Sequence, residues 1–291
     1  MTSASTEIAE GLLGTDAERF DRLSEALCTY RALVVAFSGG TDSALLAYVA
    51  TAVLGRDAVV CTTANSPSLA PEDLEETRTL AVEWGLRHTV VLTDELADPR
   101  YLANDLDRCF HCKTALMDVL VPIARAGDAT VALGVNLDDL GEHRPGQRAA
   151  REAGAVFPLL DAGLSKEDVR SLSSALGLRT WDKPSNACLS SRIPQGTPVT
   201  LTRLDQVAKA ESALRRLGFS QIRVRHHGEI ARIELDPAEL GRAVDERSLI
   251  VDAIRAVGYT HVTLDLGGFR SGGLVEVALE RARDRSRASD F

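Results

Sequence analysis

The sequence predicts an α/β protein whose parallel sheet is covered by helices on both faces, followed by a smaller C-terminal α+β domain. Three observations lead to this fold class. Short apolar runs alternate with amphipathic helical stretches from residue 33 to residue 176. A glycine-rich turn joins the first apolar run to the first of these helices. Segment 182–198 then breaks the alternation with three prolines and a glycine, which is typical of a loop at a domain junction.

The apolar runs have the length and continuity of strands that are buried on both faces, as strands of a parallel sheet are. The predicted strands are 33–37, 58–62, 88–92 and 130–135, with 155–160 as a fifth candidate. Between them, apolar residues recur at helical spacing. The predicted helices are 42–53, 71–84, 113–124 and 165–176.

Beyond the junction the pattern changes to that of a small α+β domain. We expect a helix over 200–217, two strands across 222–235 that turn near His227 and Gly228, a helix over 249–257 and a strand over 262–266. The predicted domains are therefore 1–181, an active-site loop and junction at 182–198, and 199–291.

Composition limits the classes of function. The 291 residues are 45% hydrophobic and carry a formal net charge of -9, which is unfavourable for a protein whose main task is to hold nucleic acid. No window resembles a membrane span, and the N-terminus lacks the basic start of a signal peptide, so we expect a cytoplasmic protein. Five cysteines do not indicate a disulfide framework, which leaves metal binding or thiol chemistry to consider.

A phosphate-binding turn is predicted where the first strand meets the first helix. The turn has two glycines between hydroxyl residues and is followed by a helix that begins near Asp42; it reads Ser38-Gly39-Gly40-Thr41-Asp42-Ser43. Glycines let the backbone approach a phosphate closely, and the helix N-terminus adds N–H donors and a favourable dipole. The alternative is an ordinary βα turn with Asp42 as the N-cap.

This turn resembles the signature of the PP-loop ATP pyrophosphatases, whose fold is that of the adenine nucleotide alpha hydrolases. The resemblance implies that ATP is cleaved to AMP and pyrophosphate and that AMP is joined to a substrate oxygen. It also implies a set of ATP-binding residues: Ser38, Gly39, Gly40, Asp42 and Ser43 for the phosphates, with Asn65, Ser66, Gly134 and Asn136 at the ends of other strands. Asp42, Asp138 and Asp139 are candidate Mg²⁺ ligands, and we expect one of the last two to be a cap or turn residue instead.

The cysteines allow several interpretations from their spacing alone. Cys109 and Cys112 form a Cys-x-x-Cys pair, and Cys188 lies in the proline-rich segment. We expect all three cysteines to lie in loops, where their sulfur atoms are available for chemistry. The pair could be half of a zinc site, a redox pair or chance. Cys28 and Cys61 are expected to be small core residues.

Several separated motifs resemble the LarE family, the sulfur transferases of nickel-pincer nucleotide biosynthesis. The resemblance spans about residues 30–273. Besides the glycine turn, it rests on segments 108–114, 144–146, 183–192, 223–225 and 264–272. It implies that a carboxylate of a pyridinium biscarboxylate mononucleotide is adenylylated and then converted to a thiocarboxylate by sulfur. It also implies ATP and Mg²⁺ as cofactors, and Cys188, Asp42 and Arg192 as catalytic residues.

Within this family the source of sulfur differs. In one form the cysteine matching Cys188 gives up its own sulfur and becomes dehydroalanine. In the other, cysteines matching Cys109, Cys112 and Cys188 hold a 4Fe-4S cluster that delivers sulfide. Because all three cysteines are present, we favour the cluster-dependent form, with these residues as its metal ligands.

Basic residues near the C-terminal hairpin complete the predicted site. Arg223 and Arg225 alternate on one strand and so project from one face, where two guanidinium groups can bind a phosphate or carboxylate. The resemblance adds Arg192 and Glu211 to this substrate or phosphate site. The alternative is a solvated strand face paired with Glu229 or Glu234. His226 and His227 are interpreted as exposed turn residues and are assigned no role. Trp84 and Trp181 are interpreted as packing residues, although Trp181 is close enough to the active-site loop to touch a ligand.

Other functions remain as alternatives. A PP-loop tRNA thiolation enzyme would also activate its substrate with ATP, but the acidic chain offers no obvious groove for nucleic acid. An NAD synthetase or amidotransferase leaves the cysteines unexplained, and the intact turn argues against a non-catalytic scaffold. The expected partners are a small nucleotide substrate and a sulfide donor, with no nucleic acid and no membrane. The resemblance implies a homo-oligomer built from trimers, such as a hexamer.

Overall fold

The computed structural model describes residues 2–140, 144–184 and 187–269, and the predicted motif at 264–272 extends past the last of them. The chain divides into two compact units. Of the described residues, the first unit holds 2–98 and 107–184, and the second holds 99–106 and 187–269. The sequence did not predict that segment 99–106 joins the second unit. Each unit is described by itself below.

The first unit is built on a four-stranded parallel sheet with the order β3-β2-β1-β4. Its strands are β1 (Leu33–Ala36), β2 (Val59–Asn65), β3 (His88–Leu92) and β4 (Thr130–Ala132). Because all neighbouring pairs are parallel, the carboxyl ends of the four strands lie at one edge. That edge is where an open α/β sheet binds its ligands.

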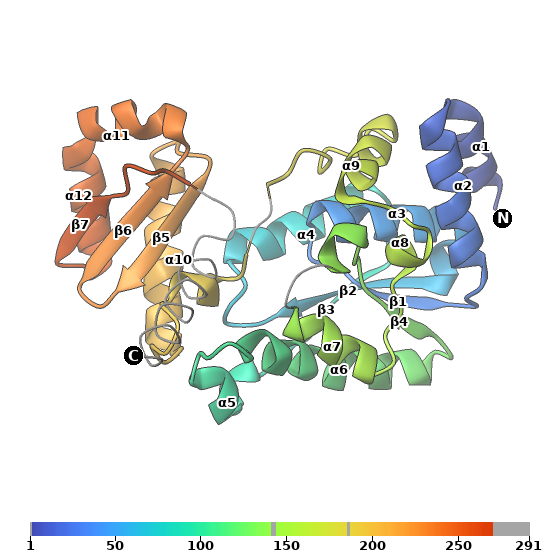
Figure 1. The fold of residues 1–291 in the computed structure, drawn as a ribbon, viewed down its shortest axis with the longest axis horizontal. Helices are drawn as coiled ribbons and strands as arrows, with labels where there is room; N and C mark the ends of the chain where they lie inside the picture. Colours follow the sequence, from blue (N-terminus) through green and yellow to red (C-terminus); the bar gives the residue numbers. More distant parts are fainter. Residues whose placement is uncertain (1, 141–143, 185–186, 270–291) are drawn as a thin grey trace, which may run out of the picture. The chain divides into compact units, whose positions relative to one another are not determined.

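Helices cover both faces of this sheet, as predicted (Figure 1). Leu33 and Val35 of β1 pack into the core shared with α3, whereas Val34 between them packs against α6 on the opposite face. This alternation follows from the two-residue period of a strand. The helices of the unit are α1 (Ser3–Gly11), α2 (Thr15–Cys28), α3 (Thr41–Leu54), α4 (Pro71–Glu83), α6 (Arg108–Ala126), α7 (Pro145–Glu152), α8 (Pro158–Asp161) and α9 (Lys166–Ala175). Short 3-10 turns are η1 (Arg56–Ala58), η2 (Glu95–Ala97) and η3 (Leu137–Leu140).

The fifth candidate strand at 155–160 is wrong. Only Val156 pairs with the sheet, through an isolated parallel bridge to Ala132. Pro158 then begins the short helix α8, because its fixed φ suits a first helical turn and it has no N–H to give to a strand neighbour. An apolar run of this length does not distinguish a strand from a buried helical turn.

The second unit is the predicted small α+β domain. Strands β5 (Ile222–His227) and β6 (Ile230–Leu235) form an antiparallel hairpin, and β7 (His261–Leu264) pairs parallel with β6. Helices α10, α11 and α12 contribute apolar residues to one core with this sheet. The helical elements are α5 (Pro99–Leu102), η4 (Leu189–Arg192), α10 (Leu201–Arg216), η5 (Pro237–Glu239), α11 (Leu240–Asp245) and α12 (Arg247–Ala256).

Within the described residues, no helix has the length and apolar character that a membrane span requires.

Candidate active site

The glycine turn lies at the carboxyl edge of the sheet, between β1 and α3. Gly39 has a φ of +69°, a conformation that glycine adopts without steric cost. The hydroxyl of Ser43 closes the turn, because Ser38 N donates to Ser43 Oγ at 3.2 Å and the two Oγ atoms lie 3.0 Å apart. Two of the predicted phosphate residues therefore fix the shape of the turn.

The first turn of α3 supplies the anion-binding groups. The earliest N–H groups of a helix have no intrahelical acceptor. Here the N-cap is Gly40, which has no side chain to accept from them. The helix is 14 residues long, so the partial positive charge of its N-terminus also favours a phosphate.

Asp42 is held from two sides at the start of α3. Asn136 Nδ2 donates to Asp42 Oδ1 at 2.9 Å, and the ammonium of Lys166 lies 2.5 Å from Asp42 Oδ2. Asn136 follows β4 and Lys166 begins α9, so three separate elements meet at this carboxylate. Lys166 was not predicted from the sequence, where it was only part of a helix start.

Asp138 and Asp139 both accept hydrogen bonds from the backbone. Asp138 Oδ2 accepts from Lys166 N at 2.5 Å, and Asp139 Oδ2 accepts from Asn136 N at 3.1 Å. Asp139 also pairs with Arg144 at 3.1 Å. In the described part of the chain, no group of three His, Cys, Asp or Glu side chains gathers that could hold a metal ion.

Gly134 lets β4 approach the glycine turn closely. A Cβ on Gly134 would stand 2.8 Å from both the carbonyl carbon of Asp42 and the amide nitrogen of Ser43. No side chain fits into that space, so the residue type at this position is set by backbone packing. Gly134 therefore lies against the backbone of the glycine turn, and its predicted part in ATP binding stays a prediction.

Two of the predicted ATP-binding residues, Asn65 and Ser66, lie at the end of β2. Asn65 is the last residue of β2, and Ser66 Oγ lies 2.9 Å from Ser68 Oγ. Ser68 in turn donates to Glu95 Oε1 at 2.9 Å, and Glu95 is only 2% exposed. This buried carboxylate orders the loop that follows β2.

Segment 180–183 lies against the glycine turn. Thr41 Oγ1 donates to the carbonyl oxygen of Thr180 at 2.9 Å, and the ammonium of Lys183 donates to the carbonyl oxygen of Gly39 at 3.0 Å. The neighbouring Trp181 is 44% exposed, so the prediction that it is a packing residue is wrong. Trp84 does pack, in edge-to-face contact with Tyr48.

The Cys-x-x-Cys pair lies in a helix and not in a loop as expected. Helix α6 begins at Arg108, five residues before the predicted start, so Cys109 and Cys112 occupy its first turns. Cys109 is exposed and Cys112 is half-buried. Gly146 of α7 approaches Cys109, because its Cβ would stand 3.0 Å from the Cys109 carbonyl oxygen. Two of the motifs that resemble LarE thus meet in the first unit.

Of the other three cysteines, Cys188 is the candidate for sulfur chemistry, and Cys61 and Cys28 are given no part in it. Cys188 is exposed and immediately precedes η4 in the second unit. Cys61 is buried in β2 as expected, and burial raises the pKa of its thiol to about 12, so it stays protonated. Cys28 is exposed at the end of α2, which contradicts its prediction as a core residue.

Arg192 fixes the backbone around Cys188. Its Nη1 donates to the carbonyl oxygens of Ala187 and Cys188 at 2.5 and 3.3 Å. Its Nε and Nη2 donate to the two oxygens of Glu211 at 2.8 and 3.2 Å. Glu211 is fully buried and also accepts from Val224 N at 3.0 Å. The sequence placed Glu211 beside the substrate, and in this structure it orients Arg192.

Arg223 and Arg225 share the face of β5 that points away from the apolar core, as predicted. That face is buried and not solvated, because Arg223 is 4% and Arg225 is 3% exposed. Glu234 binds Arg225 through two hydrogen bonds of 2.9 and 3.0 Å, so the alternative pairing with Glu234 is observed for Arg225. Arg223 lies over the ring of Phe269 at 4.2 Å.

The charges around Arg223 give this cluster an excess of cations. Burial, together with the nearby charges of Arg192 and Arg225, lowers the pKa of Arg223 to about 10 against the opposing effect of Glu234 and Glu211. The guanidinium stays charged at neutral pH. Among the described residues, Glu211 pairs with Arg192 and Arg215, and Glu234 pairs with Arg225 and Arg232, so the cations of the cluster outnumber its carboxylates. Such a cluster is suited to receive one more negative group.

The two histidines beside these arginines differ in exposure. His226 is 5% exposed and its Nδ1 lies 3.2 Å from the hydroxyl of Tyr259, so the prediction of an exposed turn residue is wrong for His226. His227 is exposed, as predicted.

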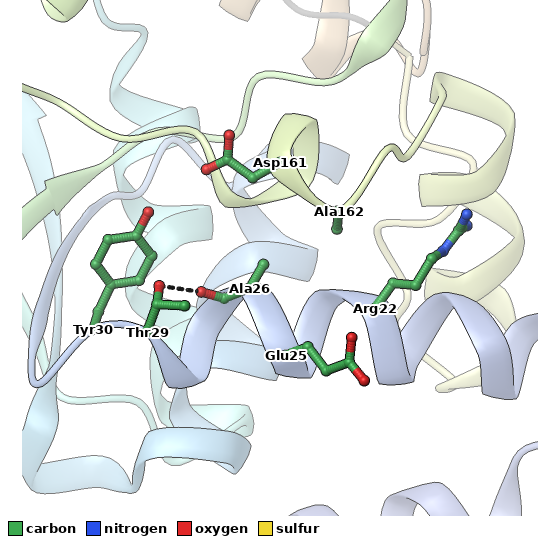
Figure 2. Close-up of a pocket in the computed structure, with 7 residues that line it drawn as sticks. All are labelled: Arg22, Glu25, Ala26, Thr29, Tyr30, Asp161 and Ala162. Atoms are coloured by element: carbon green, nitrogen blue, oxygen red, sulfur yellow. Dashed lines mark hydrogen bonds between the residues drawn. The ribbon is translucent and has the colours of Figure 1, made fainter.

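A pocket of about 400 Å³ lies elsewhere in the first unit (Figure 2). It is lined by residues of α2 and the end of α8, including Arg22, Tyr30 and Asp161. Tyr30 precedes β1 by three residues, which places it at the amino end of that strand. Open α/β sheets bind nucleotides at the opposite, carboxyl edge, so this pocket does not lie at the edge where this fold class binds a nucleotide.

The parallel sheet, the glycine turn at its carboxyl edge and the anion-binding start of α3 define a PP-loop protein that uses ATP. In agreement, the NAD synthase family matches residues 20–99, which include β1, the turn and α3. Use of ATP with Mg²⁺ is implied by this class.

The relatives define the family more closely. The pyridinium-3,5-bisthiocarboxylic acid mononucleotide synthase of Lactiplantibacillus plantarum is 40% identical over 261 residues, which cover 89% of this chain and 95% of that protein. An uncharacterised Synechocystis protein is 48% identical over 84% of this chain and 92% of its own length. One from Methanocaldococcus jannaschii is 26% identical over 82% and 91%. The chain belongs to the LarE family, that of the Lactiplantibacillus synthase.

Proposed function

We propose that this enzyme uses ATP to insert sulfur into a pyridinium-3,5-biscarboxylate mononucleotide, as a step of nickel-pincer cofactor synthesis. The observation that carries the proposal is the 40% identity to the Lactiplantibacillus synthase over 95% of that relative. The match covers 89% of this chain, so it extends through both units.

The first step is adenylylation. A carboxylate is a poor electrophile, so sulfur cannot displace its oxygen directly. An oxygen of the substrate carboxylate attacks the α-phosphorus of ATP, the bond to the β-phosphate oxygen breaks, and pyrophosphate leaves. The N–H groups at the start of α3 fit the phosphates, and Asp42 would hold Mg²⁺, which supplies positive charge against them.

The second step is attack by sulfur on the acyl adenylate. A sulfur nucleophile bonds to the carbonyl carbon, the bond to the phosphate oxygen breaks, and AMP leaves with that electron pair. If Cys188 supplies the sulfur, loss of its α-proton then breaks the Cβ–S bond, and the electron pair stays on sulfur. The products are a thiocarboxylate and dehydroalanine at position 188.

Arg192 and the cluster around Arg223 are proposed to serve this reaction from the second unit. Arg192 binds the carbonyl oxygen of Cys188 and keeps its backbone in place. Arg223 and Arg225, with their excess positive charge, would bind the phosphate or a carboxylate of the substrate.

The iron-sulfur form of the mechanism stays a prediction. In the part of the chain that the structure describes, no three metal-ligating side chains lie together, so we route no step through a cluster. Cytoplasmic location and a homo-oligomer built from trimers are likewise predictions, which fractionation and light scattering would test.

The experiment is turnover with the purified protein, ATP, Mg²⁺ and the pyridinium dicarboxylate nucleotide. We expect AMP and pyrophosphate to form only when the nucleotide substrate is present. Absence of both products with that substrate would contradict the proposal. The tRNA thiolation alternative predicts AMP release with bulk tRNA instead, and a gel shift with that tRNA.

Intact mass and iron analysis after anaerobic purification then separate the two sulfur sources. Loss of about 34 Da, the mass of hydrogen sulfide, indicates sacrifice of Cys188. Unchanged mass with bound iron indicates the cluster. Cys188→Ala should abolish sulfur transfer in both cases, whereas Cys28→Ala, at an exposed cysteine of α2, is the matched control.

A further inference from the structure

A lysine that lies far along the chain from the glycine turn reaches into it. The ammonium of Lys183 donates to the carbonyl oxygen of Gly39 at 3.0 Å. The two residues are 144 positions apart, yet both belong to the first unit. The contact therefore places a cation beside the backbone groups that would surround the phosphates.

The charge of Lys183 is not matched by a carboxylate. Among the described residues, the acceptor recorded for its ammonium is the neutral Gly39 carbonyl, and no ion pair joins it to an acidic side chain. The nearby Asp42 is already paired with Lys166 at 2.5 Å. The turn therefore has one positive charge in excess before any ligand arrives.

The backbone around Lys183 is tied to the turn as well. Thr41, 3% exposed, donates through Oγ1 to the Thr180 carbonyl oxygen at 2.9 Å and lies 3.4 Å from that of Lys183. Lys183 N also donates to Thr180 O at 3.2 Å. A lysine on a fixed backbone loses less conformational entropy when it binds a ligand.

We propose that Lys183 binds the part of ATP that leaves as pyrophosphate. The α-phosphorus must stay open to the substrate carboxylate, so the β- and γ-phosphates are the ones that enter the turn. Negative charge grows on them as the bond to the α-phosphate breaks, and a cation placed in advance stabilises that change. Thr41 is the positioning residue that holds the lysine there. This inference rests on the proposed use of ATP and names a residue for it.

The test compares equilibrium binding of three probes to Lys183→Gln: ATP with Mg²⁺, inorganic pyrophosphate and AMP. A hydrogen bond to a charged group contributes about 1.5–3 kcal/mol, so we expect ATP and pyrophosphate to bind about 10- to 100-fold more weakly. AMP should bind within about twofold of the unchanged protein, because it lacks the β- and γ-phosphates. Lys183→Arg should restore most of the affinity, since arginine keeps the charge.

The control variant is Lys209→Gln, because Lys209 is an exposed lysine of α10 that pairs with Asp205. It should bind all three probes as the unchanged protein does. Thr41→Val removes the Oγ1 donor, so it should weaken the binding of ATP and pyrophosphate but not that of AMP. Thr41→Ser should restore the affinity for ATP and pyrophosphate.

Two outcomes would overturn the inference. In the first, Lys183→Gln binds ATP and pyrophosphate with unchanged affinity. In the second, its affinity for AMP falls as much as its affinity for ATP and its Tm is lower, which is expected if Lys183 only stabilises the fold. Failure of the proposed function looks different. In that case the unchanged protein still binds ATP in a Lys183-dependent way, but it forms no AMP with the pyridinium substrate.

Discussion

At the residue scale, Asp42 shows how the turn balances its charge. A carboxylate beside a phosphate site repels the ligand unless a cation or metal ion neutralises it. Lys166 does so here, with its ammonium 2.5 Å from Asp42 Oδ2 and both side chains about a quarter to a third exposed. In the proposed function Asp42 holds Mg²⁺, which would then compete with Lys166 for this carboxylate.

We predict that Lys166→Met increases the affinity of the ATP site for Mg²⁺. The substitution keeps the length of the side chain and removes the competing charge, so the Mg²⁺ concentration that half-saturates ATP binding should fall by about 2- to 5-fold, the range expected of a partly exposed ion pair. Titration with Mg²⁺ at fixed ATP measures it. Lys209→Gln serves again as the control. A higher Mg²⁺ requirement in Lys166→Met would show instead that Lys166 itself contacts the phosphates.

Individual site residues could be predicted from the sequence, but their partners could not. The turn residues and Asn136 were predicted because motifs combine residue type with spacing. Lys166 meets Asp42 from 124 positions away, and Lys183 meets Gly39 from 144 positions away. A local sequence pattern cannot predict contacts between residues so far apart in the chain. They form only when folding brings separate segments together at the edge of the sheet.

At the element scale, the approach of β4 to α3 positions the nucleotide edge. Gly134 lies where a Cβ would come within 2.8 Å of the backbone of Asp42 and Ser43. Backbone atoms cannot rotate away as the end of a long side chain can, so any larger residue must push the two elements apart.

We predict that Gly134→Ala lowers the free energy of unfolding by about 1–3 kcal/mol, and that ATP affinity falls with it because the start of α3 moves. Gly127→Ala is the matched control at the other end of β4. Gly127 has a φ of -100°, and its Cβ would meet nothing closer than 3.7 Å. Urea unfolding and ATP binding measure both effects. Equal behaviour of the two variants would show that β4 can shift at no cost.

Elements with a regular period were predictable, and those that depend on tertiary contacts were not. The βα alternation and the β5–β6 hairpin are confirmed. The early start of α6 was missed because residues 108–112 lack an apolar period, although they continue the helix. The burial of this face of β5 was not predicted, because two arginines on a strand indicate ligand binding or, as the alternative, a solvated face. In the structure Glu234 and the carbonyl oxygen of Ser191 bind Arg225 in the interior.

At the scale of the whole molecule, both units contain histidines whose protonation opposes folding. Burial, and then the charge of Arg78, lowers the pKa of His88 in the first unit. In the second unit, burial followed by repulsion from Arg203 lowers the pKa of His226.

The direction of the pH effect follows from these lowered pKa values. Between each folded-state pKa and the usual value of about 6.5, the unfolded chain binds more protons than the folded chain, so stability rises with pH. The stability that these histidines contribute to the folded chain is fully present above about pH 6.5 and is lost as the pH falls through their folded-state pKa values. Carboxylates affect stability only at lower pH. Asp168 is an example: burial raises its pKa, but its bonds to Ser165 and Arg19 outweigh burial and lower the pKa from 3.8.

We therefore predict that the Tm of the full chain falls by a few degrees between pH 7 and pH 5.5, and that His88→Gln with His226→Gln reduces this slope. Glutamine keeps a hydrogen-bonding group for Thr63, whose Oγ1 lies 2.8 Å from His88 Nε2, but it takes up no proton in this range. His261→Gln, at an exposed histidine of β7, should keep the full slope. Thermal unfolding followed by circular dichroism at half-unit pH steps measures all three proteins. If the double variant loses Tm on acidification as steeply as the unchanged chain, buried imidazoles are not what destabilises the fold in mild acid.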